Sequence, residues 1–155
     1  MKQYHSWFSL YFAKTYAVNC FVFFVLFALQ MPSLFASSAE QSLAKGEYLA
    51  RVGNCLGCHT AKGGTPFAGG RRLTTAFGTF ITPNITPDKE TGIGHWTEED
   101  FWLAMHEGKS RDGRMLYPAF PYTEFTKISR ADVRSIFEYL RSVSAVSQTN
   151  SAHEV

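Results

Sequence analysis

The chain has 155 residues, of which 45% are hydrophobic and 18% are charged, so it has room for one ordinary domain and is too apolar for wholesale disorder. Residues 1–39 hold two lysines and no acid, and the 13 basic and 13 acidic side chains from residue 40 onward cancel. A domain without net charge lacks the excess of basic side chains that DNA- and RNA-binding proteins carry, so nucleic-acid binding is excluded. Three cysteines are too few for a small fold held together by disulfides.

The first segment has the pattern of an export signal. Residues 17–29 form a hydrophobic run of 13 residues, which fits the core of a signal peptide and is shorter than the roughly 20 residues of a membrane-spanning helix. Small residues follow, and residues 37–39 fit a cleavage site. We therefore expect residues 1–39 to be a signal peptide, cut after Ala39 or Ala36, with an uncleaved membrane anchor as the alternative.

Three later stretches carry apolar residues at helical spacing: residues 41–52, 98–107 and 130–143. Thr97 followed by Asp100 predicts a capping box at the start of the second stretch, and Gly108 predicts its end. Ser129 followed by Asp132 opens the third. Long loops rich in glycine and proline separate the stretches, and three short helices bury little apolar area, so we expect the loops to wrap a large apolar group.

The motif with the clearest chemistry is Cys55-Leu56-Gly57-Cys58-His59. Two thiols three residues apart can reach the two vinyl groups of one porphyrin, and the next residue then lies beneath the iron. The motif therefore predicts one haem c, attached through Cys55 and Cys58, with His59 as the proximal iron ligand.

Three other interpretations of the two cysteines are less favoured. A zinc site needs four ligands, and the remaining histidines from residue 40 onward are irregularly spaced: His95, His106 and His153. A thioredoxin-like redox pair would need a βαβ setting, and we find no convincing strand pattern. A plain structural disulfide is the third alternative.

Six further segments carry a family resemblance: Lys45–Leu49, Pro66–Arg71, Phe77–Thr79, Asn84–Asp88, Thr91–Gly94 with Trp96, and Leu116–Tyr122. With them, the chain from about Leu43 to Leu140 resembles a class I cytochrome c. More narrowly, it resembles the haem modules of cytochrome c subunits in bacterial dehydrogenases for alcohols, gluconate and aldehydes. The resemblance implies an all-α class I cytochrome c fold, with three main helices and long loops wrapped around one haem, and with the first and last helices crossed near Gly46.

The resemblance also suggests a domain plan. Such dehydrogenase subunits usually carry three haem motifs, whereas this sequence contains one. We therefore expect residues 40–145 to form a mono-haem cytochrome c domain and residues 146–155 to form a disordered C-terminal tail.

The distal iron ligand is less determined. Many relatives have a methionine ligand where this chain has Phe120, which offers no ligand atom. Met115, five residues earlier in the same loop, is the favoured substitute. The alternatives are Met105, which we expect in the core, a histidine such as His106, and an open site.

Three more residues are expected around the haem. In relatives a backbone carbonyl at the position of Pro66 accepts the proximal imidazole N–H, a bond that fixes the orientation of the ring. The indole N–H of Trp96 suits a haem propionate, although an ordinary buried tryptophan is equally consistent. Arg71 could neutralise a propionate, with a solvated surface pair of Arg71 and Arg72 as the alternative.

The expected function is that of a periplasmic electron carrier and not of an enzyme. Its partners would be an exported dehydrogenase and a terminal oxidase or another cytochrome, with no nucleic acid, and with the membrane only if the N-terminal segment is uncleaved. A haem enzyme or ligand sensor with an open distal site is the alternative, and the lack of an acid–base constellation near Phe120 opposes it.

Mass spectrometry checks the motif and the signal together. Protein matured in a host that attaches c-type haem should be cleaved between Ala36 and Glu40 and should carry the mass of one haem. A mature protein of unmodified mass would contradict the attachment through Cys55 and Cys58.

Overall fold

The structure is a computed structural model that describes residues 38–116 and 119–154. The hydrophobic run at 17–29 and nearly all of the predicted signal peptide lie outside these residues. By its internal contacts the chain divides into residues 1–40 and 41–155, and the fold below is that of the second unit. None of the helices in the described ranges combines the length and the hydrophobicity that crossing a bilayer requires.

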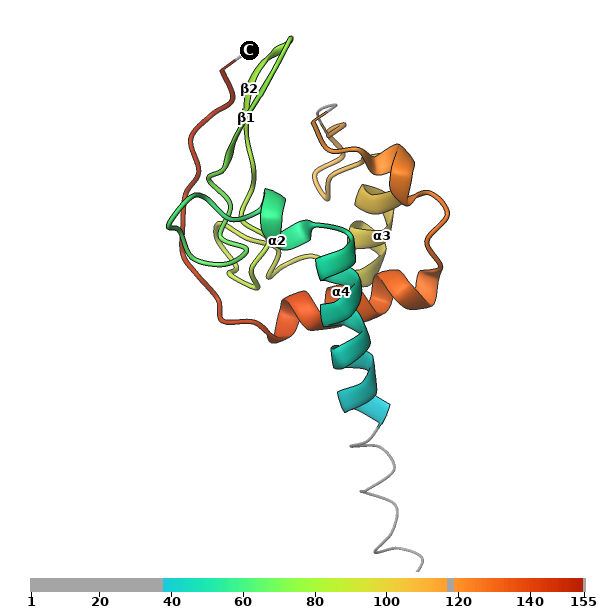
Figure 1. The fold of residues 1–155 in the computed structure, drawn as a ribbon. Helices are drawn as coiled ribbons and strands as arrows, with labels where there is room; N and C mark the ends of the chain where they lie inside the picture. Colours follow the sequence, from blue (N-terminus) through green and yellow to red (C-terminus); the bar gives the residue numbers. More distant parts are fainter. Residues whose placement is uncertain (1–37, 117–118, 155) are drawn as a thin grey trace, which may run out of the picture. The chain divides into compact units, whose positions relative to one another are not determined.

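Helices form most of the regular structure, and a small β-hairpin is added to them (Figure 1). In chain order the elements are a first helix over residues 38–52, α2 (Cys55–Cys58), β1 (Arg72–Thr75), β2 (Gly78–Ile81), α3 (Glu98–Glu107), the 3-10 helix η1 (Tyr122–Phe125) and α4 (Arg130–Ser142). The three predicted helices are confirmed. The all-α expectation is corrected by the hairpin.

The hairpin is antiparallel, and its register runs from the pair Arg72–Ile81 to the pair Thr75–Gly78. Its strands are only four residues long, and β1 has almost no buried side chain, so the sequence carries little of the alternation that marks a strand. Gly78 has a φ of 122°, a conformation that favours glycine and allows the tight turn before β2.

The ends of α3 and α4 form as their sequences predict. The hydroxyl of Thr97 accepts a hydrogen bond from the Asp100 N–H, and the Asp100 carboxylate accepts one from the Thr97 N–H. Gly108 ends α3 with a φ of 65°. At the start of α4 the hydroxyl of Ser129 accepts from the N–H of Asp132. These bonds satisfy N–H groups that have no partner within the helix.

The first helix crosses α4 at a point where both backbones approach closely (Figure 1). A β-carbon on Gly46 would lie 1.9 Å from the carbonyl oxygen of Ser135, so only glycine fits there. Lys45 pairs with Asp132 at 2.5 Å beside the crossing. The predicted packing of these two helices, with Gly46 at the contact, is confirmed.

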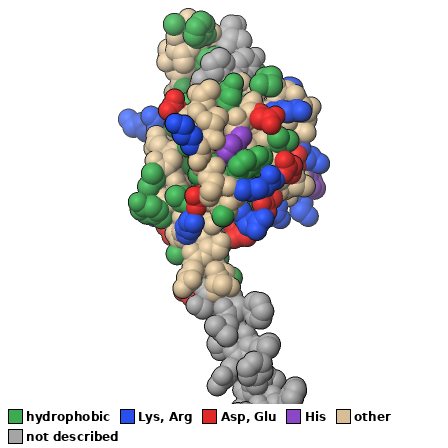
Figure 2. Space-filling model, turned by 90° about the vertical axis from the view of Figure 1, so that its right-hand side faces the viewer, with side chains coloured by type: hydrophobic (Ala, Val, Ile, Leu, Met, Phe, Trp, Pro, Cys, Tyr) green, Lys and Arg blue, Asp and Glu red, His purple; other side chains and the backbone are tan. Residues whose placement is uncertain are grey.

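The apolar core lies among the first helix, α3 and α4. Its buried members are Ala50, Phe67, Ile93, Phe101, Met105, Val133, Ile136, Phe137 and Leu140. The rings of Phe101 and Phe137 stack with centroids 5.2 Å apart and join α3 to α4. Outside the core, basic and acidic side chains are interspersed on the face shown in Figure 2, in keeping with the neutral charge from residue 40 onward.

The segment after α4, which is expected to be a disordered tail, makes several contacts with the rest of the domain. Residues 146–154, here called the C-terminal strap, run extended beside the hairpin and the loop that follows it (Figure 1). Glu154 forms an antiparallel bridge with Thr79 through N–H···O bonds of 2.8 and 2.9 Å, and its carboxylate pairs with Arg72. The polar composition of the strap predicts disorder. In the structure its polar groups form hydrogen bonds with backbone and side-chain groups of the hairpin and the loop.

Phe137 tests the helix packing. Replacement of this buried ring by alanine should lower the free energy of unfolding by about 3–5 kcal/mol, because it removes the stacking partner of Phe101 and leaves a cavity. Chemical denaturation measures the loss. Phe77→Ala at the exposed hairpin tip is the matched control and should change stability by less than about 0.5 kcal/mol. Equal losses in the two variants would contradict the packing.

Candidate haem-attachment site

The two thiols of the motif are presented by a single helical turn. The first helix ends near residue 52, and Asn54, with a φ of 57°, turns the chain into α2. Because Cys55 and Cys58 are three residues apart in α2, their side chains lie on neighbouring positions of one face. Both thiols are free, and the His59 N–H donates to the Cys55 carbonyl at 2.8 Å, which places His59 directly after the turn.

The His59 ring is fixed by one hydrogen bond. Its Nδ1 lies 2.9 Å from the carbonyl oxygen of Pro83. A carbonyl oxygen can only accept, so Nδ1 carries the proton and the lone pair of Nε2 is free to bind a metal. Burial lowers the pKa of the His59 imidazole, with the bond to Pro83 acting in the opposite direction, so the ring is held in the neutral form that ligates.

The acceptor of this bond was predicted at Pro66, and the structure corrects it to Pro83. Pro66 is exposed, and the residues after it bind the backbone around the motif: the Gly69 N–H donates to the carbonyl of His59 at 2.8 Å. The sequence shows Pro83 only as one proline of a long loop. No local pattern tells which of the loop carbonyls folds back onto the ring.

Half-buried apolar side chains from several segments pack against the same core as Cys55. Five of them are here called the apolar wall: Leu56, Ile85, Trp96, Phe120 and Phe125. Phe120 stacks on Phe125 with ring centroids 5.8 Å apart. A β-carbon on Gly53 would lie 3.5 Å from the Phe125 ring and 3.7 Å from the Cys55 sulfur, so Phe125 of the wall lies near Cys55.

These residues fit a haem. A haem is a large apolar disc that needs two thiols for its vinyl groups, one neutral imidazole with a free nitrogen, and apolar side chains against its face. The motif supplies the two thiols and the imidazole, and the half-buried apolar wall, of which Phe125 lies near Cys55, supplies the apolar side chains.

The other uses of the two cysteines fit less well. Burial raises the pKa of the Cys55 thiol to about 11, whereas the attacking cysteine of a reactive redox pair has a lowered pKa. In the described part of the chain, no group of three or more His, Cys, Asp or Glu side chains is placed to hold a metal ion by itself.

The candidates for the distal ligand are in different environments. Met105 is buried in the core, as expected. The two ring nitrogens of His106 lie 3.3 Å from the carbonyl oxygen of Trp102 and 3.1 Å from that of Ile128, and a neutral ring can donate to only one of these oxygens. Met115 is 63% exposed on a tight turn, where its backbone forms an isolated antiparallel bridge with that of Lys109. Of the two methionines in the described ranges, Met115 is the one that packing leaves available.

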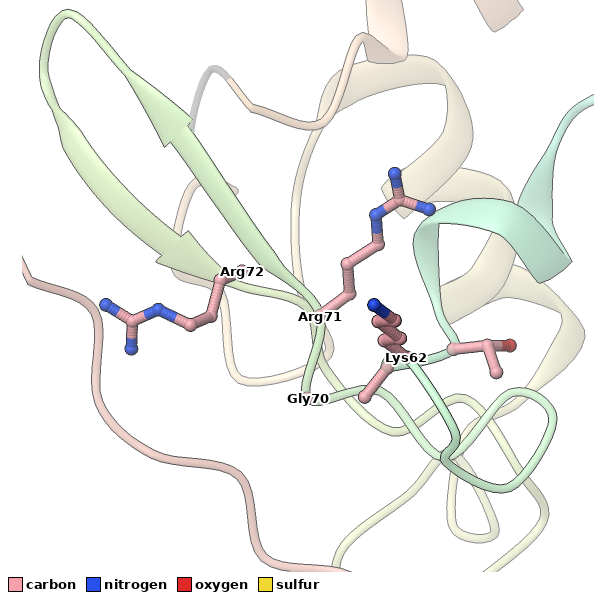
Figure 3. Close-up of a pocket in the computed structure, with 6 residues that line it drawn as sticks. Lys62, Gly70, Arg71 and Arg72 are labelled. Carbon is pink, nitrogen blue, oxygen red and sulfur yellow. The ribbon is translucent and has the colours of Figure 1, made fainter.

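Arg71 lies beside the motif, in a pocket of about 580 Å³ that Thr60, Lys62, Gly70 and Arg72 also line (Figure 3). The Arg71 guanidinium donates to the carbonyl of Gly57, between the two cysteines. Arg72 points the other way and pairs with Glu154 at 2.6 Å. Arg71 is thus near the attachment turn, whereas contacts of Arg71 and Trp96 with propionates stay predictions.

Comparisons with known proteins agree with this geometry. The sequence model of the cytochrome c family matches residues 43–144. The chain therefore belongs to the cytochrome c family, as the sequence analysis predicts.

Its relatives include components of several dehydrogenases. A subunit of the nicotinate dehydrogenase of Pseudomonas putida is 50% identical over 113 residues, which are 73% of this chain and 10% of that protein. The gluconate 2-dehydrogenase cytochrome c subunit of Pantoea cypripedii is 42% identical, over 84% of this chain and 30% of its own length. The cytochrome c subunit of the quinone-type alcohol dehydrogenase of Gluconobacter oxydans is 41% identical, with coverages of 84% and 28%.

Two of these relatives are named cytochrome c subunits of dehydrogenases, in agreement with the expectation of an electron carrier and not a catalytic enzyme. The chain spans between 10% and 30% of the length of the three relatives.

Proposed function

We propose that this chain is a single-haem c-type cytochrome of class I fold, which carries electrons one at a time between an exported dehydrogenase and the respiratory chain. The observation that carries the proposal is the His59 imidazole directly after the two thiols, with Nδ1 bound to the Pro83 carbonyl and Nε2 free. The single motif in the sequence supports one haem, and the predicted signal peptide supports the periplasm.

Each residue of the site has a task in this function. Cys55 and Cys58 would attach the haem through thioether bonds, His59 would bind one side of the iron, and Met115 would bind the other. When bound, the haem supplies an iron that accepts and releases one electron. The carbonyl of Pro83 keeps the ring of His59 in one orientation, so little rearrangement accompanies the change of charge.

Dehydrogenase subunits among the relatives support a dehydrogenase as the electron donor. A terminal oxidase or another cytochrome would be the acceptor. Such transfer needs no acid or base from the protein, because no substrate bond is broken. Phe120, which stacks on Phe125, offers neither.

Absorbance spectroscopy with a potentiometric titration tests the proposal. Exported protein from a host that attaches c-type haem should show a haem spectrum that changes between two states with the slope of one electron. Cys55→Ala/Cys58→Ala should lose the haem stain after denaturing electrophoresis. Wild-type protein without a redox-active haem would refute the proposal.

The distal ligand has its own test. Met115→Ala should abolish the weak charge-transfer band that a thioether–iron bond gives at the red end of the oxidised spectrum, and it should lower the reduction potential. Met105→Ala is the matched control and should only loosen the core, because this side chain is buried among Phe101 and its neighbours. Loss of the band in the Met105 variant instead would assign the ligand to α3, and a wild-type protein without the band would point to an open site.

A further inference from the structure

The C-terminal strap lies against the loop that supplies the acceptor of His59. The carbonyl of Val146 accepts a hydrogen bond of 2.7 Å from the side-chain amide of Asn84, and the N–H of Val146 donates to the hydroxyl of Thr86 at 3.2 Å. The N–H of Gln148 donates to the hydroxyl of Thr91 at 3.0 Å. The strap thus bonds to the loop on the residues that follow Pro83.

Asn84 is the centre of this contact. Its side chain is 3% exposed and bonds in three directions. The side-chain carbonyl accepts from the N–H of Thr86 at 2.9 Å, and the amide donates to the hydroxyl of Thr91 and to the carbonyl of Val146 at 2.9 and 2.7 Å. An asparagine so buried and so fully bonded has little freedom to turn.

The position of Asn84 limits where the Pro83 carbonyl can lie. The carbonyl of Pro83 and the nitrogen of Asn84 belong to the same planar peptide unit, so anchoring Asn84 orients the carbonyl that faces His59. Proline has no N–H of its own, and Pro83 is exposed, so the loop is held by its neighbours. On the other side, Gly70 donates to the carbonyl of Thr82 at 2.9 Å.

We infer that Asn84, together with the backbone of the C-terminal strap at Val146, is a positioning device for the proximal ligand. It acts through the Pro83 carbonyl and holds the hydrogen bond to Nδ1 of His59. This role rests on the proposed function, in which Nε2 of His59 binds the haem iron.

The device has a consequence with a definite sign. A hydrogen bond from Nδ1 to a carbonyl makes Nε2 more basic, and a more basic ligand stabilises the oxidised iron. Weakening the bond should therefore raise the reduction potential. A substitution that only loosens the loop and admits water should instead lower the reduction potential, because water favours the more highly charged oxidised state.

Two neutral substitutions remove different parts of the contact in the complete holoprotein. Asn84→Ala removes all three side-chain bonds, and Val146→Pro removes the N–H that binds Thr86. Ser147→Ala is the matched control within the strap, since Ser147 is exposed. None of these changes adds or removes a charge that would itself shift the potential.

Spectroelectrochemistry and nuclear magnetic resonance give the two readouts. We expect Asn84→Ala and Val146→Pro to raise the reduction potential and to speed solvent exchange of the His59 Nδ1 proton, while Ser147→Ala matches the wild type. An unchanged or lowered potential in both variants, or an unchanged exchange rate, would overturn the inference. If Asn84→Ala fails to accumulate, Val146→Pro and Thr91→Val supply the same comparison, because Thr91 links Asn84 to Gln148.

Failure of this inference is distinguishable from failure of the proposed function. A wild-type protein with haem and variants with wild-type potential would refute the positioning role alone. A wild-type protein without haem would refute the proposed function. In that event, exchange of the His59 Nδ1 proton in the haem-free wild type and Asn84→Ala still decides whether Asn84 holds the bond to Pro83.

Discussion

The hydrogen bond between the His59 imidazole and the Pro83 carbonyl is the interaction on which the site depends. It joins residues 24 positions apart and determines which ring nitrogen carries the proton. Without it the ring could rotate or change tautomer, and Nε2 would have no fixed direction. Whatever places the carbonyl of Pro83 therefore also places the candidate iron ligand.

The helical frame provides the other half of this geometry. The close approach at Gly46 fixes the first helix against α4, and the turn with Cys55 and Cys58 continues from the end of that helix. Stacking of Phe101 on Phe137 fixes α3 on the same helix α4. The thiols and the apolar wall thus come from separate segments of the chain, and the helices next to them both pack on α4.

The loops are held by a different kind of interaction. Three buried residues of the loop after β2 are polar: Thr82, Asn84 and Thr86. In the described ranges no buried side-chain nitrogen or oxygen lacks a hydrogen-bond partner. Since an unbonded buried polar group is costly, such a network favours one arrangement of the loop over others, although it buries little apolar surface. The C-terminal strap is part of that network through Val146 and Gln148.

The parts of this protein that depend on neighbouring residues can be predicted from the chain alone. Helical periodicity and capping pairs such as Thr97 with Asp100 are local, and so is the spacing of Cys55, Cys58 and His59, so the helices and the attachment motif could be predicted. The choice of the Pro83 carbonyl and not Pro66 as the partner of His59, and the path of residues 146–154 beside the hairpin and its following loop, depend on contacts between distant residues. The reason is physical: every backbone carbonyl is an equally good acceptor, and a polar strap is positioned by distant partners, so neither choice leaves a trace in local composition.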